Sequence, residues 1–195
     1  RIKLAQKHVP LSLNNMKGDS EMTALKFDDD DIKAINIPLP PEAKKELVIH
    51  TNEDDERLWV PRGDDVWFRP LMYNVTQGSW VNLTRATKEG VIGRHRHPAP
   101  VTGFTLKGSW GYLEHDWEAR QGTFIYEPAG ETHTLIVTPT EGHMLTLFHN
   151  FGPLIMVDKN GNQTGYEDVF TRIEKVKLHY KKAGVSMDIL DRIIM

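Results

Sequence analysis

Three histidines provide the most distinctive chemical signal in this sequence. His95 and His97 are separated by a single residue. On a β-strand, alternate side chains point to the same face of the sheet, so both imidazoles can approach one metal ion. The same spacing also fits two strand histidines in a polar pocket, and the pair therefore has to be interpreted with its context.

A second histidine-bearing segment provides that context. Residues 122–133 have the pattern G-x5-P-x-G-x2-H, which ends at His133. The first glycine can open a strand, and the proline and second glycine favour a tight turn. His133 then begins the next strand, which a closed barrel can bring back beside the first pair.

The absence of cysteine limits the kinds of site that the chain can build. Disulfides, iron–sulfur clusters and a cysteine nucleophile are excluded, so a transition-metal site must use histidine, aspartate or glutamate. The net charge is −3 with scattered basic residues, which indicates neither nucleic acid nor an anionic membrane as a partner. No apolar run approaches the roughly 20 residues that span a bilayer. No apolar core follows the first residues either, and we expect a cytoplasmic protein.

The distribution of apolar residues predicts an all-β fold. From about residue 47 onward, short apolar segments are separated by turn residues, many of them glycines. This pattern is typical of a sandwich or barrel of short strands. We predict an N-terminal, partly extended arm over residues 1–40, a β-barrel over residues 41–160, and C-terminal helices packed on the barrel over residues 161–195.

The C-terminal segment carries signals for the start and end of helices. Thr164 and Glu167 have the spacing of a capping box. Apolar residues then recur at helical spacing as far as Gly184, which favours a helix end, and Ser186 can cap a last short helix. The residues expected on the apolar face are Val169, Phe170, Ile173, Val176 and Tyr180.

Two segments resemble the conserved motifs of the cupin superfamily. The segment that ends at His133 matches the second motif without a gap, although Val137 stands where an asparagine is usual. The first motif matches around His95 and His97, but its first glycine lies one residue closer than usual, and Val101 occupies the position of a glutamate ligand. The resemblance implies a cupin barrel (a double-stranded β-helix, or jelly roll) that holds one divalent metal ion on the three histidines.

The missing glutamate indicates a smaller group within the cupin superfamily. Cupins with three histidine ligands and no glutamate include the acetylacetone dioxygenases and the 2,4'-dihydroxyacetophenone dioxygenases. Residues 94–103, 107–112 and 124–130 look most similar to these two groups, and the chain length is closer to the second. The resemblance implies a non-haem iron(II) dioxygenase. Such an enzyme cleaves a carbon–carbon bond beside a carbonyl, giving 4-hydroxybenzoate and formate from 2,4'-dihydroxyacetophenone; a β-diketone such as acetylacetone is the alternative substrate.

Glu127 is the candidate general base. It lies six residues before His133, and in acetylacetone-cleaving relatives a glutamate at this spacing lies near the metal without binding it. A base in this position would help to remove a proton from the substrate. The alternatives are that Glu127 is a turn carboxylate facing water, and that Glu114 supplies the missing ligand.

Further side chains are expected to form the substrate pocket, because an aromatic ketone requires an apolar lining. The candidates are Trp80, Phe104, Tyr112 and His149. Arg85, Arg94 and Arg96 are candidates for holding an anionic group, although Arg96 alternates with the two histidines and is expected to point outward.

Two other functions are compatible with the same residues. Three histidines can also hold zinc, manganese or nickel, in an isomerase, a lyase or a hydrolase. A metal-binding cupin without catalytic activity, such as a ligand sensor, is the second alternative, because a fold does not imply a function. Metal identity and oxygen uptake would distinguish these functions from a dioxygenase. By resemblance to related cupins, we also expect a homodimer or a homotetramer.

Overall fold

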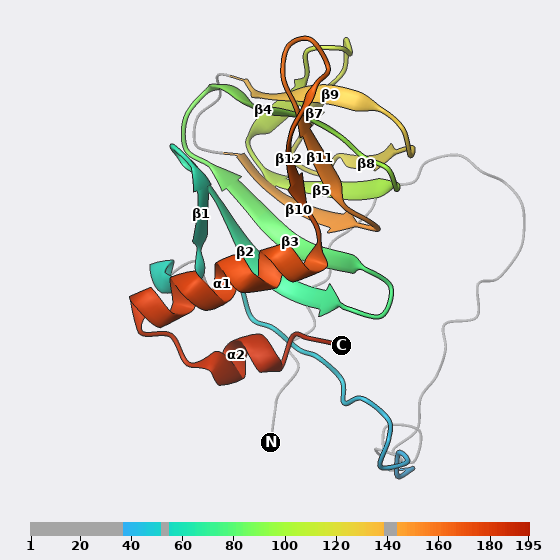
Figure 1. The fold of residues 1–195 in the computed structure, drawn as a ribbon, viewed down its shortest axis with the longest axis vertical. Helices are drawn as coiled ribbons and strands as arrows, with labels where there is room; N and C mark the ends of the chain where they lie inside the picture. Colours follow the sequence, from blue (N-terminus) through green and yellow to red (C-terminus); the bar gives the residue numbers. More distant parts are fainter. Residues whose placement is uncertain (1–36, 52–54, 139–143) are drawn as a thin grey trace, which may run out of the picture. The chain divides into compact units, whose positions relative to one another are not determined.

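Two six-stranded antiparallel sheets pack on each other through a shared apolar core (Figure 1). The structure, a computed structural model, describes residues 37–51, 55–138 and 144–195, and residues 44–195 form one compact unit. The expected all-β class is therefore confirmed. Most of the predicted arm over residues 1–40 lies outside the described residues, so the arm stays a prediction.

The order of the strands in each sheet differs from their order in the chain. In spatial order, the first sheet contains β1 (Val60–Gly63), β2 (Val66–Asn74), β3 (Ser79–Ala86), β10 (Met144–Asn150), β5 (Val101–Lys107) and β8 (Phe124–Glu127). The second contains β12 (Gln163–Glu167), β11 (Leu154–Val157), β4 (Gly90–Arg96), β9 (Thr132–Val137), β6 (Ser109–Tyr112) and β7 (Glu118–Arg120). Pairs such as β3 with β10 and β4 with β9 join distant segments, and this is how the chain wraps into a jelly roll.

Alternation along the strands decides which side chains enter the interior. In β8, Ile125 and Glu127 point inward, whereas Phe124 and Tyr126, which alternate with them, are exposed. A strand has a side-chain period of two, so one position in each pair must face solvent when only one face of the sheet is covered. The same alternation that turns Ile125 towards the core therefore also points Glu127 inward.

Two C-terminal helices, α1 (Val169–Ala183) and α2 (Met187–Asp191), follow the strands, and α1 packs on the β1–β2 side of the first sheet (Figure 1). The predicted apolar face is buried at four of its five positions, but Phe170 is 58% exposed, because it lies outside the i, i+4, i+7, i+11 stripe that begins at Val169. Gly184, with a φ of +69°, ends α1, and Ser186 caps α2, as predicted. Neither helix in the described part of the chain combines the length and the apolar character that crossing a bilayer requires.

The start of α1 differs from the prediction. Thr164 and Glu167 do not cap a helix, because they lie in β12, which pairs with β11. The capping box is formed instead by Asp168 and Thr171: the Asp168 side chain accepts a hydrogen bond from the Thr171 backbone N–H, and the Thr171 hydroxyl accepts one from the Asp168 N–H. Pairing with β11 extends the strand region beyond residue 160 and shifts the helix start to Val169.

A buried ion pair joins β12 to α1. Glu167 is 1% exposed and accepts a hydrogen bond of 2.7 Å from the Arg172 guanidinium, which also stacks on the ring of Phe68. Burial alone would raise the pKa of Glu167, but the positive charges of Arg172 and Arg62 outweigh this effect and lower its pKa to about 2. The junction is therefore held by a carboxylate that stays ionised in most conditions.

Acidification is expected to destabilise the fold through Glu167. Its folded pKa of about 2 lies below an ordinary value of 4.5, so the stabilisation is complete above pH 4.5 and is lost as the pH falls towards 2. The difference corresponds to about 3 kcal/mol in the free energy of unfolding. Urea unfolding at neutral pH and at about pH 3 should show a smaller loss of stability in Glu167→Gln than in the wild type.

The matched control is Glu174→Gln, since Glu174 is an exposed carboxylate on the same helix. Its pH dependence should equal that of the wild type. If Glu167→Gln and the wild type lose the same stability on acidification, the junction does not depend on the ionised carboxylate.

Candidate metal centre

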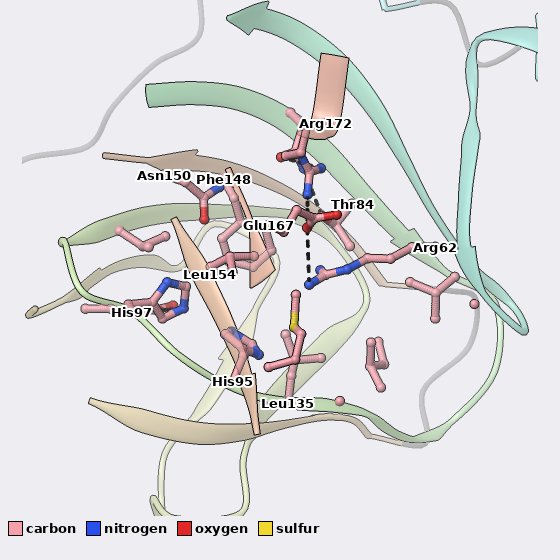
Figure 2. Close-up of a pocket in the computed structure, with 18 of the residues that line it drawn as sticks. Arg62, Thr84, His95, His97, Leu135, Phe148, Asn150, Leu154, Glu167 and Arg172 are labelled. Atoms are coloured by element: carbon pink, nitrogen blue, oxygen red, sulfur yellow. Dashed lines mark hydrogen bonds and ion pairs between the residues drawn. The ribbon is translucent and has the colours of Figure 1, made fainter. Parts of the chain in front are cut away.

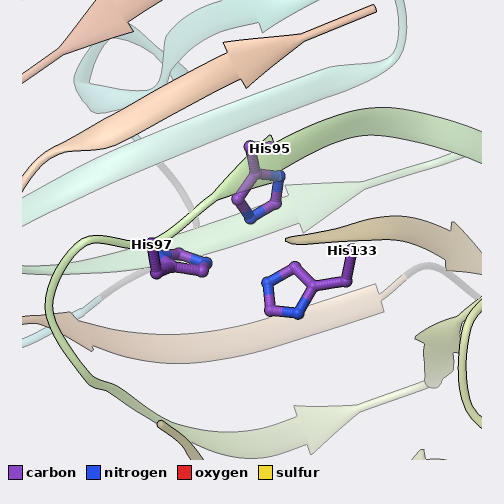
Figure 3. Close-up of side chains that lie close together, drawn as sticks. All are labelled: His95, His97 and His133. Atoms are coloured by element: carbon purple, nitrogen blue, oxygen red, sulfur yellow. The ribbon is translucent and has the colours of Figure 1, made fainter. Parts of the chain in front are cut away.

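Two neighbouring strands bring the three histidines together (Figure 3). His95 on β4 and His133 on β9 are direct cross-strand partners. His97 follows the end of β4, where its N–H donates to the Glu131 carbonyl at 3.1 Å and its carbonyl accepts from the Gly130 N–H at 2.7 Å. These two backbone hydrogen bonds hold His97 against the turn that leads into β9.

The three rings form a tight, buried cluster. Their centroids are 4.6 Å (His95 to His97), 5.0 Å (His95 to His133) and 4.9 Å (His97 to His133) apart. One nitrogen from each ring lies within 4.8 Å of the others, and His133 is fully shielded from solvent. The predicted grouping of these histidines is therefore present in the structure, and the cluster can hold a metal ion.

All three histidines are held in the neutral form near pH 7. Burial lowers the pKa of His97 to about 3 and that of His133 to about 4. Burial also lowers the pKa of His95 well below its ordinary value, and the positive charge of Arg62 acts in the same direction. Neutral imidazole is the form that binds a metal, so the protein environment favours the ligand form at the pH of most cells.

The carboxylate of Glu127 lies beside the histidine cluster, in contact with two of its rings. Its Oε2 atom lies 3.2 Å from His97 Nε2 and 3.4 Å from His133 Nε2. Its Oε1 atom accepts a hydrogen bond of 2.6 Å from the Tyr112 hydroxyl, and the Tyr112 ring stacks on His133 at 3.8 Å. Burial raises the pKa of Glu127 to about 7, although the Tyr112 hydrogen bond acts in the opposite direction. The interpretation of Glu127 as a turn carboxylate facing water is wrong, because the side chain is 3% exposed.

The strand register explains how this carboxylate reaches the histidines. Val101, at the position where the cupin motif has a glutamate, is the direct cross-strand partner of Glu127. Directly opposed residues of two antiparallel strands point to the same face, with Cβ atoms about 5 Å apart. The carboxylate that is missing from β5 is thus present on the neighbouring strand β8.

The polar atoms of this cluster fit a divalent transition metal. Within the described part of the chain, both ring nitrogens of His97 and His133 and the Oε2 atom of Glu127 are buried without a hydrogen-bond partner. Leaving such groups unpaired costs stability, which a metal ion bound by the imidazoles would offset. A second group, His115, Glu131 and His133, also has ligand atoms within 4.8 Å, but it shares His133 with the first group and is more exposed.

A cavity of about 480 Å³ lies between the two sheets and begins at the histidines (Figure 2). His95, His97, Tyr112 and Glu127 line one part of it. Apolar side chains from both sheets also line it, namely Val66, Leu135, Phe148 and Leu154. Its far part contains Arg62, Glu167 and Arg172. The volume is typical of a pocket for a small organic ligand.

Of the predicted pocket residues, only Tyr112 lines this cavity. Phe104 lies on the outer face of β5 and is 43% exposed, and His149 lies on the outer face of β10 and stacks on Phe151. Trp80 is buried in the core beneath α1. The strand positions that do enter the cavity from β10 are Phe148 and Asn150, one residue away from the predicted His149.

The three arginines considered for an anionic group also lie elsewhere. Arg85 forms a salt bridge of 2.6 Å with Glu56 and stacks on Trp59. Arg94 donates to the Thr134 hydroxyl at 2.8 Å, and Arg96 is exposed, as expected from its alternation. The arginines that line the cavity are Arg62 on β1 and Arg172 on α1, which no local sequence signal identifies.

Glu114 is not a ligand of the histidine cluster. Its carboxylate accepts hydrogen bonds from the Thr134 N–H at 2.7 Å and from the Thr134 hydroxyl at 2.8 Å. The Thr134 side chain points to the opposite face of β9 from His133, because successive side chains of a strand alternate.

Comparisons with known proteins agree with this architecture. The sequence profile of the ChrR cupin-like domain matches residues 44–155. No curated protein sequence matches the chain. An RmlC-like cupin protein from Ralstonia eutropha superposes with a TM-score of 0.62 at 29% identity, over 66% of this chain and 84% of that one. An acetylacetone dioxygenase from Acinetobacter johnsonii gives a TM-score of 0.59 at 16% identity, over 72% and 99% of the two chains. The predicted cupin fold is confirmed.

The histidine cluster is expected to bind one divalent ion per chain. Replacing His97 or His133 by alanine should lower the affinity for iron(II) or zinc(II) by roughly 100-fold or more, because two imidazoles remain. Metal analysis after dialysis and titration against a competing chelator measure this affinity. Thermal unfolding should show a rise in Tm on metal addition for the wild type only.

The matched control is His149→Ala, because His149 lies on the outer face of β10. This variant should bind metal as the wild type does. Wild-type affinity in His133→Ala would show that the ion, if bound, is held elsewhere.

Proposed function

Since the chain belongs to the family of ChrR cupin-like domains, we propose that it is a metal-dependent cupin enzyme. The specific activity that we propose is that of a non-haem iron(II) dioxygenase, which cleaves a carbon–carbon bond beside a carbonyl group. The observation that carries this proposal is the buried cluster of three neutral histidines facing Glu127 at one end of a ligand-sized cavity. The fold shared with an acetylacetone dioxygenase supports it.

His95, His97 and His133 would hold the metal ion. When bound, iron(II) supplies Lewis acidity towards the oxygen atoms of a chelating ketone and the redox chemistry that dioxygen requires. The three histidines contribute no negative charge, so this donor set favours a substrate that binds as an oxyanion. A hydroxyketone or a β-diketone becomes such an oxyanion by losing one proton.

Glu127 would accept that proton. Its Oε2 atom lies on the histidine side of the cavity, and Tyr112 fixes the other carboxylate oxygen through a 2.6 Å hydrogen bond. The stacking of Tyr112 on His133 couples the orientation of the base to the orientation of one imidazole. General-base catalysis requires this kind of fixed geometry before the substrate arrives.

The apolar middle of the cavity would enclose the rest of the substrate. Phe148 from the first sheet and Leu154 from the second lie between the histidines and Glu167 (Figure 2), and Leu135 also lines the cavity. They would exclude water from the reacting carbonyl and orient a small aromatic or aliphatic body. For 2,4'-dihydroxyacetophenone, addition of O₂ and cleavage between the carbonyl carbon and the carbinol carbon gives 4-hydroxybenzoate and formate, with one oxygen atom in each product. Acetylacetone is the alternative substrate.

A metal-binding cupin without oxygenase activity is the second candidate. The match to the ChrR cupin-like domain is compatible with it as well. The same histidines can hold zinc, manganese or nickel. An isomerase, a lyase, a hydrolase or a ligand sensor would bind metal as strongly as a dioxygenase but would consume no oxygen. The expected homodimer or homotetramer stays a prediction in either case.

Oxygen uptake is the direct test of the proposed function. The protein is purified anaerobically, loaded with iron(II) and mixed with 2,4'-dihydroxyacetophenone or, separately, with acetylacetone. We expect stoichiometric oxygen consumption with one of them, together with a carboxylate product, and no consumption by His133→Ala. Full iron occupancy without oxygen uptake for any chelating ketone would contradict the dioxygenase and favour the second candidate.

Replacing Glu127 tests the role of the base. Glu127→Gln keeps the shape of the side chain but removes the proton acceptor, so kcat should fall by about 100-fold or more. The iron content should remain that of the wild type, as should the activity of the distant control Glu174→Gln. If Glu127→Gln instead loses its iron, the carboxylate is a ligand of the ion and not the base.

A further inference from the structure

The far part of the cavity contains more positive than negative charge around Glu167. Three cationic side chains surround this carboxylate: Arg172 at 2.7 Å, Lys175 at 2.5 Å and Arg62 at 3.9 Å. One carboxylate balances one of the three charges. Asp64 also lines the cavity, but it is an exposed residue. The wall opposite the histidines is therefore electropositive.

The charges of Arg172 and Lys175 already have partners within the fold or in solvent. Arg172 is 2% exposed, donates to Glu167 and to Asn82, and stacks on Phe68, so its guanidinium is committed to the junction between β12 and α1. Lys175 donates to Glu167 from a side chain that is 52% exposed. Neither side chain needs a ligand to satisfy its charge.

Arg62 differs from both of these cations. Its contact with Glu167 is a long one of 3.9 Å, and among the described residues its guanidinium forms no hydrogen bond. Glu167 already accepts short hydrogen bonds from Arg172 and Lys175 on its two oxygens. The planar donor fork of Arg62 is thus available to a ligand inside the cavity.

Arg62 also lies within electrostatic reach of the metal centre. It extends from β1 into the cavity between Glu167 and His95, as Figure 2 shows. Its positive charge contributes to lowering the pKa of both His95 and His97. Burial lowers the pKa of Arg62 itself, since its surroundings solvate the charge poorly, and an anion placed beside it would compensate for this.

We propose that Arg62 binds an anionic group at the end of the substrate that lies away from the reacting carbonyl. The substrate class is then a chelating ketone that carries a remote carboxylate, which the guanidinium can bind through two parallel hydrogen bonds. This inference rests on the proposed function for the chelating end of the molecule only. A neutral diketone or an uncharged phenolic ketone would leave Arg62 without a partner.

A matched pair of ligands tests the inference without turnover. The probes are 2-hydroxyacetophenone and its 4-carboxylate, 4-(hydroxyacetyl)benzoate, which share the chelating group and differ in the remote charge. Binding is measured by calorimetry on the zinc(II)-loaded protein, in which no oxygen chemistry occurs. We expect the wild type to bind the carboxylate about tenfold more tightly or better, and Arg62→Gln to lose this preference.

Two controls separate recognition from a structural effect. Arg96→Gln removes the same charge from an exposed position on β4 and should keep the preference. Arg62→Gln should unfold at the wild-type temperature, because Glu167 retains Arg172 and Lys175. If Arg62→Gln does not fold, Arg62→Lys decides the question: it keeps a charge near Glu167 but lacks the planar fork, and it should lose most of the preference.

The outcomes also separate this inference from the proposed function. Equal binding of both ligands by the wild type, a preference that survives in Arg62→Gln, or a preference undiminished in Arg62→Lys overturns the bidentate anion site and leaves Arg62 as a partner of Glu167 alone. A preference that requires Arg62, in a protein that consumes no oxygen when loaded with iron(II), supports the anion site and contradicts the dioxygenase. Oxygen consumption without any preference contradicts only the anion site.

Discussion

The antiparallel pairing of β4 with β9 is the constraint on which the rest of the site depends. This ladder places His95 directly opposite His133, and the turn before β9 holds the backbone of His97. A slip of one residue would turn His133 to the other face of the sheet and remove it from the cluster. The cluster therefore requires the correct register between two strands that lie far apart in the sequence.

Burial, which stabilises the core, also sets the protonation states of the three histidines and of Glu127. The same desolvation keeps the three histidines neutral and raises the pKa of Glu127 to about 7. It has a cost, because several nitrogen and oxygen atoms of the cluster are left without hydrogen-bond partners among the described residues. Unpaired buried polar groups of this kind are expected at functional sites, where a ligand or metal completes the set.

The ion pair between Glu167 and Arg172 connects the second sheet to the helix that covers the first. It fixes one wall of the cavity and leaves Arg62 with a long contact to the same carboxylate. The cavity thus has a histidine end, an apolar middle and an electropositive end. This polarity argues for a ligand that is itself polar at both ends, and the cupin fold alone would not reveal it.

The sequence by itself determined the elements that depend on short-range patterns. The one-residue spacing of His95 and His97, the glycine and proline turn before His133 and the apolar stripe of α1 were all predictable from local spacing. The contact of Glu127 with the histidines was decided by its pairing with Val101 across two strands, and the approach of Arg62 by the packing of two sheets. The same holds for the errors at His149, Phe104 and the start of α1. For His149 and Phe104 the packing of the two sheets determined which strand face is interior, and for α1 the pairing of β12 with β11 determined where the helix begins; local sequence encodes neither.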